Sequence, residues 1–228
     1  MEVKIVCLFI TCLFAAIPAG ALEAVYDGEG NLMTQEEIAE AERMVAIGER
    51  IQREGERDRM SKELNVPQYF QTDSRWANSF MPCGHAGHTY GAVGCAMTSY
   101  AMVFKYYGSN VTPVDVATTC QRVSPPCCNF SSAPLCQAYG RSRLNSGDDY
   151  TTSQIKSFII GSINTGKPAI IRLSKNGGNH FVVAYRYYEN YSGQYVINIK
   201  ETDPRIGYQN IEQYLNSGWG IDFATRVR

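Results

Sequence analysis

One cysteine of this 228-residue sequence stands where a nucleophile would be expected. Cys95 lies in the stretch GAVGCAMTSY, directly before an apolar run with helical spacing. At a helix N-terminus, the macrodipole and the free N–H groups of the first turn favour a thiolate. Gly91 and Gly94 permit the close backbone approach that an oxyanion site requires. These features favour Cys95 as a nucleophile.

A cysteine nucleophile needs a base, and only three histidines are available. His180 begins the strand-like segment HFVVAYRYY, where a side chain can face a cleft. Asp203, in ETDP, ends the next strand-like segment. If the two segments are antiparallel neighbours, Asp203 can orient His180. Gln71 is a candidate oxyanion donor, since its side-chain amide acts without a proton transfer.

The N-terminus has the pattern of a secretory signal peptide, predicted over residues 1–21. Lys4 precedes an apolar stretch that is too short to span a bilayer, and small residues follow it. We expect cleavage near Ala21 and a secreted or otherwise extracytoplasmic protein. No later apolar run is long enough for a membrane span, so no stable membrane anchor is expected.

Export to an oxidising compartment makes paired cysteines the default. The chain has eight cysteines, and two of them, Cys7 and Cys12, leave with the signal peptide. The remaining six pair evenly, so parity favours a disulfide at Cys95. If Cys95 is free, two bridges and one unpaired thiol are expected among the other five, with the pairing open: Cys83, Cys120, Cys127, Cys128 and Cys136. Direct pairing of the adjacent Cys127 and Cys128 is disfavoured by S–S geometry.

A second group of potential metal ligands occurs in CGHAGH, which contains Cys83, His85 and His88. Thiolate and imidazole suit zinc, but the paired spacing of common zinc motifs is absent. We therefore expect a glycine-rich surface loop with a disulfide at Cys83, and neither a metal nor a cofactor. The net charge of −1 argues against a nucleic-acid partner.

The segment 22–64 differs in composition from the residues C-terminal to it and is predicted to be a charged helical pro-segment or a stalk. Residues 27–63 hold eleven acidic and six basic residues, whereas the chain from residue 65 onward carries a net charge of +5. Opposite charges are compatible with docking of an intramolecular pro-segment on the domain, although a solvated stalk has the same composition. Thr34 and Glu37 form a capping box that predicts a helix start.

Residues 65–228 are predicted to form one domain with helices first and antiparallel strands later, an α+β fold. Helices are expected from Cys95 to about Gly108, from Pro113 to Cys120, and over TSQIKSFIIGSIN with Thr152 or Ser153 as its cap. Residues 121–150 are expected to be a long loop held by disulfides. Three strand-like segments follow: PAIIRLS, HFVVAYRYY and YVINIKET.

Several of these segments occur together in a known order. VPQYFQTDSRWAN, GAVGCAMTSYAMVFKYYG, GKPAIIRLS, GNHFVVAYRYY and ETDP resemble the papain-fold cysteine peptidases related to bacteriocin-processing, double-glycine leader peptidases. The resemblance covers residues 66–220. It implies a papain-like fold with Cys95 as nucleophile, His180 as general base and acid, Asp203 as orienting residue and Gln71 as oxyanion donor. No transporter segments follow, so coupling to export is not expected.

Two classes of function remain open on the sequence. The first is a secreted papain-like cysteine peptidase that hydrolyses peptide or protein substrates with a Cys-His-Asp triad; the same triad permits amide or peptidyl transfer to an amine. The second is a non-catalytic secreted binding module on the same scaffold, with Cys95 in a disulfide.

Overall fold

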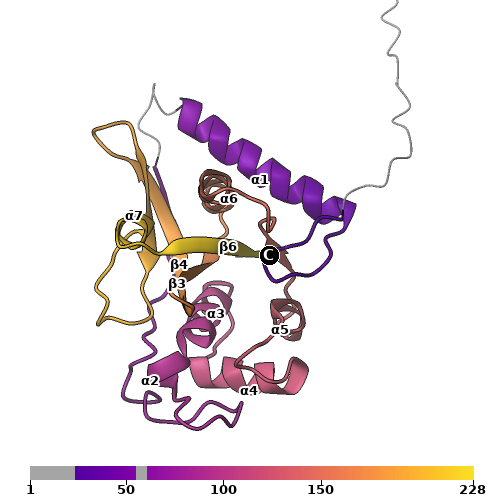
Figure 1. The fold of residues 1–228 in the computed structure, drawn as a ribbon, viewed down its shortest axis with the longest axis vertical. Coiled ribbons are helices and arrows are strands. Elements are labelled where there is room, and N and C mark those ends of the chain that lie inside the picture. The colour runs from indigo at the N-terminus through magenta and orange to yellow at the C-terminus, as the bar shows by residue number, and fades with distance from the viewer. Residues whose placement is uncertain (1–23, 55–60) are drawn as a thin grey trace, which may run out of the picture.

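A computed structural model of the chain describes residues 24–54 and 61–228 (Figure 1). The predicted signal peptide, with Cys7 and Cys12, lies outside the described residues, as do residues 22–23 and 55–60 of the predicted pro-segment. The chain has the α+β organisation expected from the sequence, with most helices preceding an antiparallel sheet.

The described residues form seven helices and six strands. The helices are α1 Gln35–Glu54, α2 Tyr90–Val93, α3 Cys95–Tyr106, α4 Pro113–Val123, α5 Ser132–Ala138, α6 Thr152–Asn164 and α7 Ile211–Asn216. The strands are β1 Ser61–Glu63, β2 Arg143–Asn145, β3 Ala169–Lys175, β4 Gly178–Glu189, β5 Tyr195–Lys200 and β6 Gly220–Val227.

The sheet is built around the long strand β4. Its first half pairs with β3, and its second half pairs with β1 on one edge and β5 on the other. The order across the sheet is β1-β4-β3-β6-β2, and all pairs are antiparallel. The strand β6 therefore lies inside the sheet, between β3 and β2, although the sequence did not predict a strand there.

Helices cover both faces of the sheet (Figure 1). On one face α3 packs against β3 and β4, with α2 and α4 beside it. On the other face α6 packs against the sheet, and α1 packs on α6. Because α6 is covered by the sheet and by α1, its large apolar side chains are all buried: Ile155, Phe158, Ile159, Ile160 and Ile163.

Side-chain caps fix where four of these helices begin, and Asn210 provides the one before α7. Thr34 and Glu37 form the predicted capping box before α1, and Thr112 forms another with Asp115 before α4. The predicted cap of α6 was wrong by one residue: Thr151, not Thr152 or Ser153, accepts the N–H of Gln154. Gly108 follows α3 with a φ of 95°, the left-handed conformation that glycine adopts readily after a helix.

The prediction of a structureless loop over residues 121–150 was wrong. The segment contains the last turn of α4, the helix α5 and the edge strand β2. Its buried Leu135 and Cys136 join the hydrophobic core, and Arg143 pairs with Asp27. These contacts are long-range, so local composition rich in serine, proline and cysteine does not reveal them.

Two glycines allow α1 and α6 to pack with their backbones in contact. A Cβ at Gly161 would lie 2.1 Å from the carbonyl oxygen of Met44, and one at Gly48 would lie 1.9 Å from that of Ser157. Arg226, buried on β6, adds an ion pair of 2.6 Å with Glu40. The helix α1 is thus closely packed and tied to the sheet by charge.

This placement bears on the role of the segment 22–64. Its described parts are α1, which packs on α6, and β1, which pairs with β4. The residues that line the cleft around Cys95 all come from later in the chain. Removal of this segment as a pro-segment stays a prediction. Its described part packs against the core of the fold.

One disulfide, Cys83–Cys128, is present among the described residues. It joins the loop before α2 to the segment after α4. Cys95, Cys120, Cys127 and Cys136 are free thiols. Two bridges were expected, and the described residues contain one, because Cys120, Cys127 and Cys136 are buried and unpaired. The described helices are all too short or too polar to cross a lipid bilayer.

The α1–α6 contact gives a first testable prediction. Gly161→Ala gains about 1 kcal/mol of helix propensity, but its methyl group overlaps the Met44 carbonyl and forces the helices apart. We expect a net loss of about 1–2 kcal/mol in the free energy of unfolding, measured by urea denaturation. At the matched control Gly220→Ala, the nearest atoms are 3.9 Å away, and a change within about 0.5 kcal/mol is expected. A Gly161→Ala protein as stable as the wild type would contradict the close packing.

Candidate active site

Cys95 is the first residue of α3, as the sequence predicts. Its N-cap is Gly94, which has no side chain to cap the helix, so the first-turn N–H groups are available to an anion at the sulfur. A Cβ at Gly94 would lie 2.4 Å from the carbonyl oxygen of Tyr90, so glycine is required where α2 passes into α3. Cys95 is a free, half-buried thiol.

His180 lies near the start of β4, and its imidazole interacts with the Cys95 side chain, which helps to raise the His180 pKa. Both residues line a cleft of about 310 Å³, together with Gln71 and Asp203. The structure thus brings all four predicted site residues to one cavity. A thiol and an imidazole in this arrangement can exchange a proton.

The carboxylate that contacts His180 is Glu201, a residue that was not among the predicted site residues. His180 Nε2 lies 2.6 Å from Glu201 Oε1, and both side chains are buried. Because Nε2 bonds to Glu201, Nδ1 is the nitrogen left for the Cys95 sulfur. The geometry therefore gives Glu201 the orienting contact that was predicted for Asp203.

Strand pairing explains this difference. Lys200, the last residue of β5, pairs with Val183 of β4, so Glu201 is the first residue past the paired segment and contacts His180 diagonally across the two chains. Glu201 Oε1 also accepts the backbone N–H of Asp203 at 2.9 Å. Beyond this point the chain turns, with the N–H of Ile206 bonded to the carbonyl of Asp203.

Aromatic residues complete the surroundings of the His180–Glu201 pair. The Tyr214 hydroxyl donates to Glu201 Oε2, and burial together with that carboxylate raises the Tyr214 pKa well above its usual value, so the hydroxyl stays a donor. The rings of Tyr214 and Trp219 lie 5.9 and 6.3 Å from the His180 ring. These contacts keep water from the pair and fix the plane of the imidazole.

The charge state of His180 follows from these neighbours. Burial lowers its pKa, but hydrogen bonds and attraction from Cys95 and Glu201 outweigh burial and raise the pKa from 6.5 to about 9. The imidazolium is thus favoured across the neutral range and is lost as the pH rises through about 9. A protonated His180 in this position can supply a proton to a leaving group.

Asp203 makes a different set of contacts. Its carboxylate accepts hydrogen bonds from Arg205, including one of 2.8 Å from Nε, and these lower the Asp203 pKa although burial raises it. Arg205 Nη2 also donates to the carbonyl of Gly91 at 3.1 Å. Through Arg205, Asp203 therefore holds the backbone of α2, the short helix that leads into Cys95.

Gln71 is buried and donates to the same Gly91 carbonyl as Arg205. Its Nε2 donates to the Gly91 carbonyl at 3.1 Å, and its backbone N–H donates to Thr202 at 2.8 Å. The side-chain amide has two hydrogens, and the bond to Gly91 uses one of them. Since Gln71 lines the cleft, the other hydrogen can serve an oxyanion.

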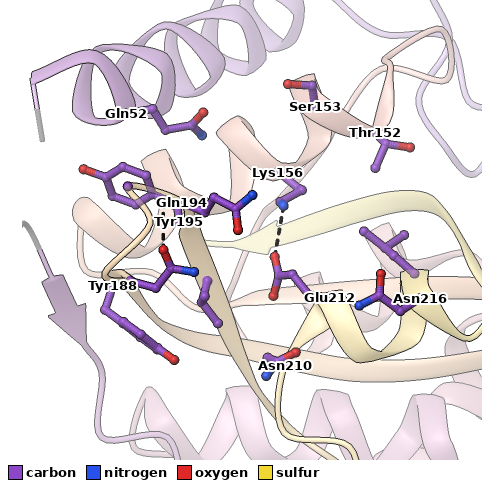
Figure 2. Close-up of a pocket in the computed structure, with 14 residues that line it drawn as sticks. Gln52, Thr152, Ser153, Lys156, Tyr188, Gln194, Tyr195, Asn210, Glu212 and Asn216 are labelled. Atoms are coloured by element: carbon purple, nitrogen blue, oxygen red, sulfur yellow. Dashed lines mark hydrogen bonds and ion pairs between the residues drawn. The ribbon is translucent and has the colours of Figure 1, made fainter. Parts of the chain in front are cut away.

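A larger hollow of about 800 Å³ lies elsewhere, between α1, α6, α7 and the β4–β5 hairpin (Figure 2). Figure 2 shows Lys156 and Glu212 facing each other across it, and they form an ion pair of 2.9 Å. Its lining is mainly polar, with Gln52, Gln194 and Asn210 around the pair. It contains neither a nucleophilic thiol nor a histidine, so the chemistry of the described residues belongs to the smaller cleft.

A helix-borne cysteine, a strand-borne histidine and a buried acid just past the neighbouring strand form the arrangement that papain-like cysteine peptidases use. A comparison with protein families agrees: the Peptidase_C39 like family matches residues 63–214, more than half of the chain. The chain belongs to this family. Neither a curated protein nor a solved structure matches the chain.

The contact between His180 and Glu201 gives a prediction that does not depend on turnover. In an NMR titration, His180 of the wild type should titrate near pH 9. Glu201→Gln keeps an acceptor but removes the charge, and should lower that midpoint by about 1–3 pH units. The matched variant Asp203→Asn should change it less, since Asp203 bonds to Arg205. A larger change in Asp203→Asn than in Glu201→Gln would contradict the assignment.

Proposed function

We propose that the protein is a secreted cysteine peptidase that cleaves peptide or protein substrates with Cys95, His180 and Glu201. Membership of the Peptidase_C39 like family supports cysteine peptidase activity. The observation that carries the residue roles is the chain of contacts from Cys95 to His180 to Glu201, buried at one end and open to a cleft at the other.

In the first step, the Cys95 thiolate attacks the carbonyl carbon of the scissile peptide bond. The negative charge that develops on the carbonyl oxygen is held by the first-turn N–H groups of α3 and by the Gln71 amide. These donors are fixed before the substrate arrives, because Gln71 is bonded to Gly91 and Thr202. Pre-organised donors of this kind need no rearrangement during the reaction.

His180 then transfers its proton to the leaving amine, which departs and leaves an acyl group on the Cys95 sulfur. The neutral imidazole next accepts a proton from water, and the resulting hydroxide attacks the thioester. Collapse of the second intermediate releases the carboxylic acid and restores the thiolate beside a protonated His180. An imidazolium that is stable at neutral pH suits the first of these transfers.

The acid that orients His180 is, in this proposal, Glu201 in place of the Asp203 implied by family resemblance. Glu201 keeps Nε2 occupied, so that Nδ1 faces the sulfur. Asp203 acts as a positioning residue: with Arg205 it holds Gly91, and hence the approach to Cys95. Loss of Asp203 would then disturb the loop more than the charge of His180.

Two alternatives fit the structure less well. A binding module with Cys95 in a disulfide is disfavoured because Cys95 is a free thiol that contacts His180. Transfer of the acyl group to an amine would use the same residues, but no feature of the described cleft favours an amine over water.

Secretion is part of the proposal and rests on the sequence of residues 1–21. The Cys83–Cys128 disulfide is compatible with it, because such bonds persist in oxidising compartments. We propose cleavage near Ala21, which leaves a mature chain that contains α1 and the whole sheet.

Cleavage of an unfolded protein tests the activity directly. The wild type, incubated with reduced casein and with a library of fluorogenic peptides, should release new amino termini. Cys95→Ala should lower this rate by roughly 10³-fold or more, because no other group can take the place of the sulfur. The matched control is Cys136→Ala, which removes a buried thiol that does not line the cleft. It should retain turnover if it folds, as checked by circular dichroism. Turnover retained in Cys95→Ala would rule out the proposed nucleophile.

A further inference from the structure

A second group of thiols lies on the wall of the same cleft. The Sγ atoms of Cys83, Cys127 and Cys128 all lie within 4.8 Å of one another. His88 Nδ1 lies 3.4 Å from Cys128 Sγ and 3.9 Å from Cys83 Sγ. These four residues, here called the thiol cluster, come from the loop before α2 and the segment after α4.

The separations between His88 and two of the sulfurs suit a tetrahedral metal site. With Zn–S near 2.3 Å and Zn–N near 2.0 Å, the edges of the tetrahedron are about 3.8 Å between two sulfurs and about 3.5 Å between sulfur and nitrogen. The two measured His88 distances lie on either side of the second value. Three thiolates and one imidazole form a common structural zinc ligand set.

A disulfide alone leaves part of the thiol cluster without a function. The Cys83–Cys128 bond uses two sulfurs, while the buried Cys127 thiol lies within 4.8 Å of both and His88 Nδ1 lies 3.4 Å from Cys128 Sγ. The backbone N–H of Cys127 donates to Gln121 Oε1 at 2.9 Å, which holds this residue in place beside the other two cysteines.

We propose that the reduced form of the thiol cluster binds one divalent cation of the zinc type through Cys83, His88, Cys127 and Cys128. The disulfide and metal forms exclude each other, because both use the sulfurs of Cys83 and Cys128. Each form links the same two segments of the chain. The expectation of no metal at CGHAGH was made without Cys127 and Cys128, which are distant in sequence.

The step between the two forms is a two-electron reduction. A phosphine reductant attacks one sulfur of the disulfide, takes its oxygen from water and becomes the phosphine oxide, while Cys83 and Cys128 become thiols. Binding of the cation then releases the three thiol protons to solvent and gives a site with a net charge of −1. In the host, a dithiol reductant would serve, and it would be oxidised to its own disulfide.

The thiol cluster forms part of the wall of the cleft. His88, Cys127 and Cys128 line the cavity that also contains Cys95 and His180. A bound cation would hold this wall in place when the disulfide is reduced. The proposed site is nevertheless independent of the proposed peptidase activity, since none of its ligands belongs to the catalytic residues.

The test uses the full chain with Cys95→Ser, so that metal bound between Cys95 and His180 is not mistaken for the new site. The protein is reduced with a phosphine, separated from excess reagent without oxygen, and titrated with Co²⁺. We expect saturation at one Co²⁺ per chain, with the intense visible absorption of a tetrahedral cobalt–thiolate site, and displacement by Zn²⁺. The air-oxidised protein, with the Cys83–Cys128 bond verified by mass spectrometry, should not produce this spectrum.

Matched variants assign the ligands. His88→Ala and Cys127→Ser should each weaken Co²⁺ binding by more than the roughly 10–100-fold that loss of an outer-shell partner costs. Neither variant breaks the disulfide, so both can fold in the oxidised form before reduction. His85→Ala, three residues from His88, and Cys136→Ser are the controls and should bind as the parent does.

Three results would overturn the proposal: no cobalt spectrum in the reduced parent, binding that is unchanged in both His88→Ala and Cys127→Ser, or equal binding by the oxidised protein. Because the parent already lacks Cys95, none of these results depends on peptide turnover. Failure of the peptidase proposal would be seen separately, in the casein experiment.

Discussion

The hydrogen bond between His180 and Glu201 is the interaction on which the rest of the site depends. A buried carboxylate is costly unless it is paired, and Glu201 is satisfied by three donors: the imidazole, the Tyr214 hydroxyl and the backbone N–H of Asp203. With Glu201 held in this way, the orientation of the imidazole is fixed. Its second nitrogen is then directed at Cys95, and its charge is maintained at neutral pH.

The scaffold explains how these residues meet. The strands β4 and β5 carry His180 and Glu201 to one edge of the sheet, while α3 presents Cys95 against β4. The opposite face is filled by α6 and closed by α1, which makes α1 part of the support for the sheet. The cleft lies between α3 and the strand ends, and the thiol cluster forms one of its walls. Structural and catalytic cysteines thus occupy one cavity with separate partners.

Much of the catalytic pair could be predicted from the sequence, because residue type and local position were sufficient. Cys95 precedes an apolar helical run, and His180 opens a strand; both remain where the pattern puts them. The orienting acid could not be chosen in this way. Glu201 and Asp203 are two residues apart and share one face of an extended strand, so periodicity does not separate them. Only the register, which ends at Lys200, and the turn after Asp203 do so. The one sequence feature that favoured Glu201 over Asp203 as the orienting acid was its position directly after the strand.

The missed elements have a similar cause. The strand β6 lies between β3 and β2 inside the sheet, yet it contains the buried polar residues Thr225 and Arg226. Their partners are Asn145 and Glu40. In a sequence, such polar residues predict a surface loop, because their distant partners are known only from the fold. The strand β2 depends likewise on the N-terminal segment, through the pair of Arg143 with Asp27, and α5 does so through the N–H of Ser132, which donates to Glu29. The disulfide partner of Cys83 also required the fold, because parity left five candidates.

Alkylation of the native protein tests most directly whether Cys95 is a thiol activated by His180. Iodoacetamide at about pH 6 should label Cys95 ahead of the buried Cys120, Cys127 and Cys136, as read by peptide mass spectrometry without reduction. Replacement of His180 by alanine should slow the labelling of Cys95 by about tenfold or more, because the imidazolium no longer stabilises the thiolate. Cys95 found in a stable disulfide, or labelled equally fast without His180, would contradict the assignment of these two residues.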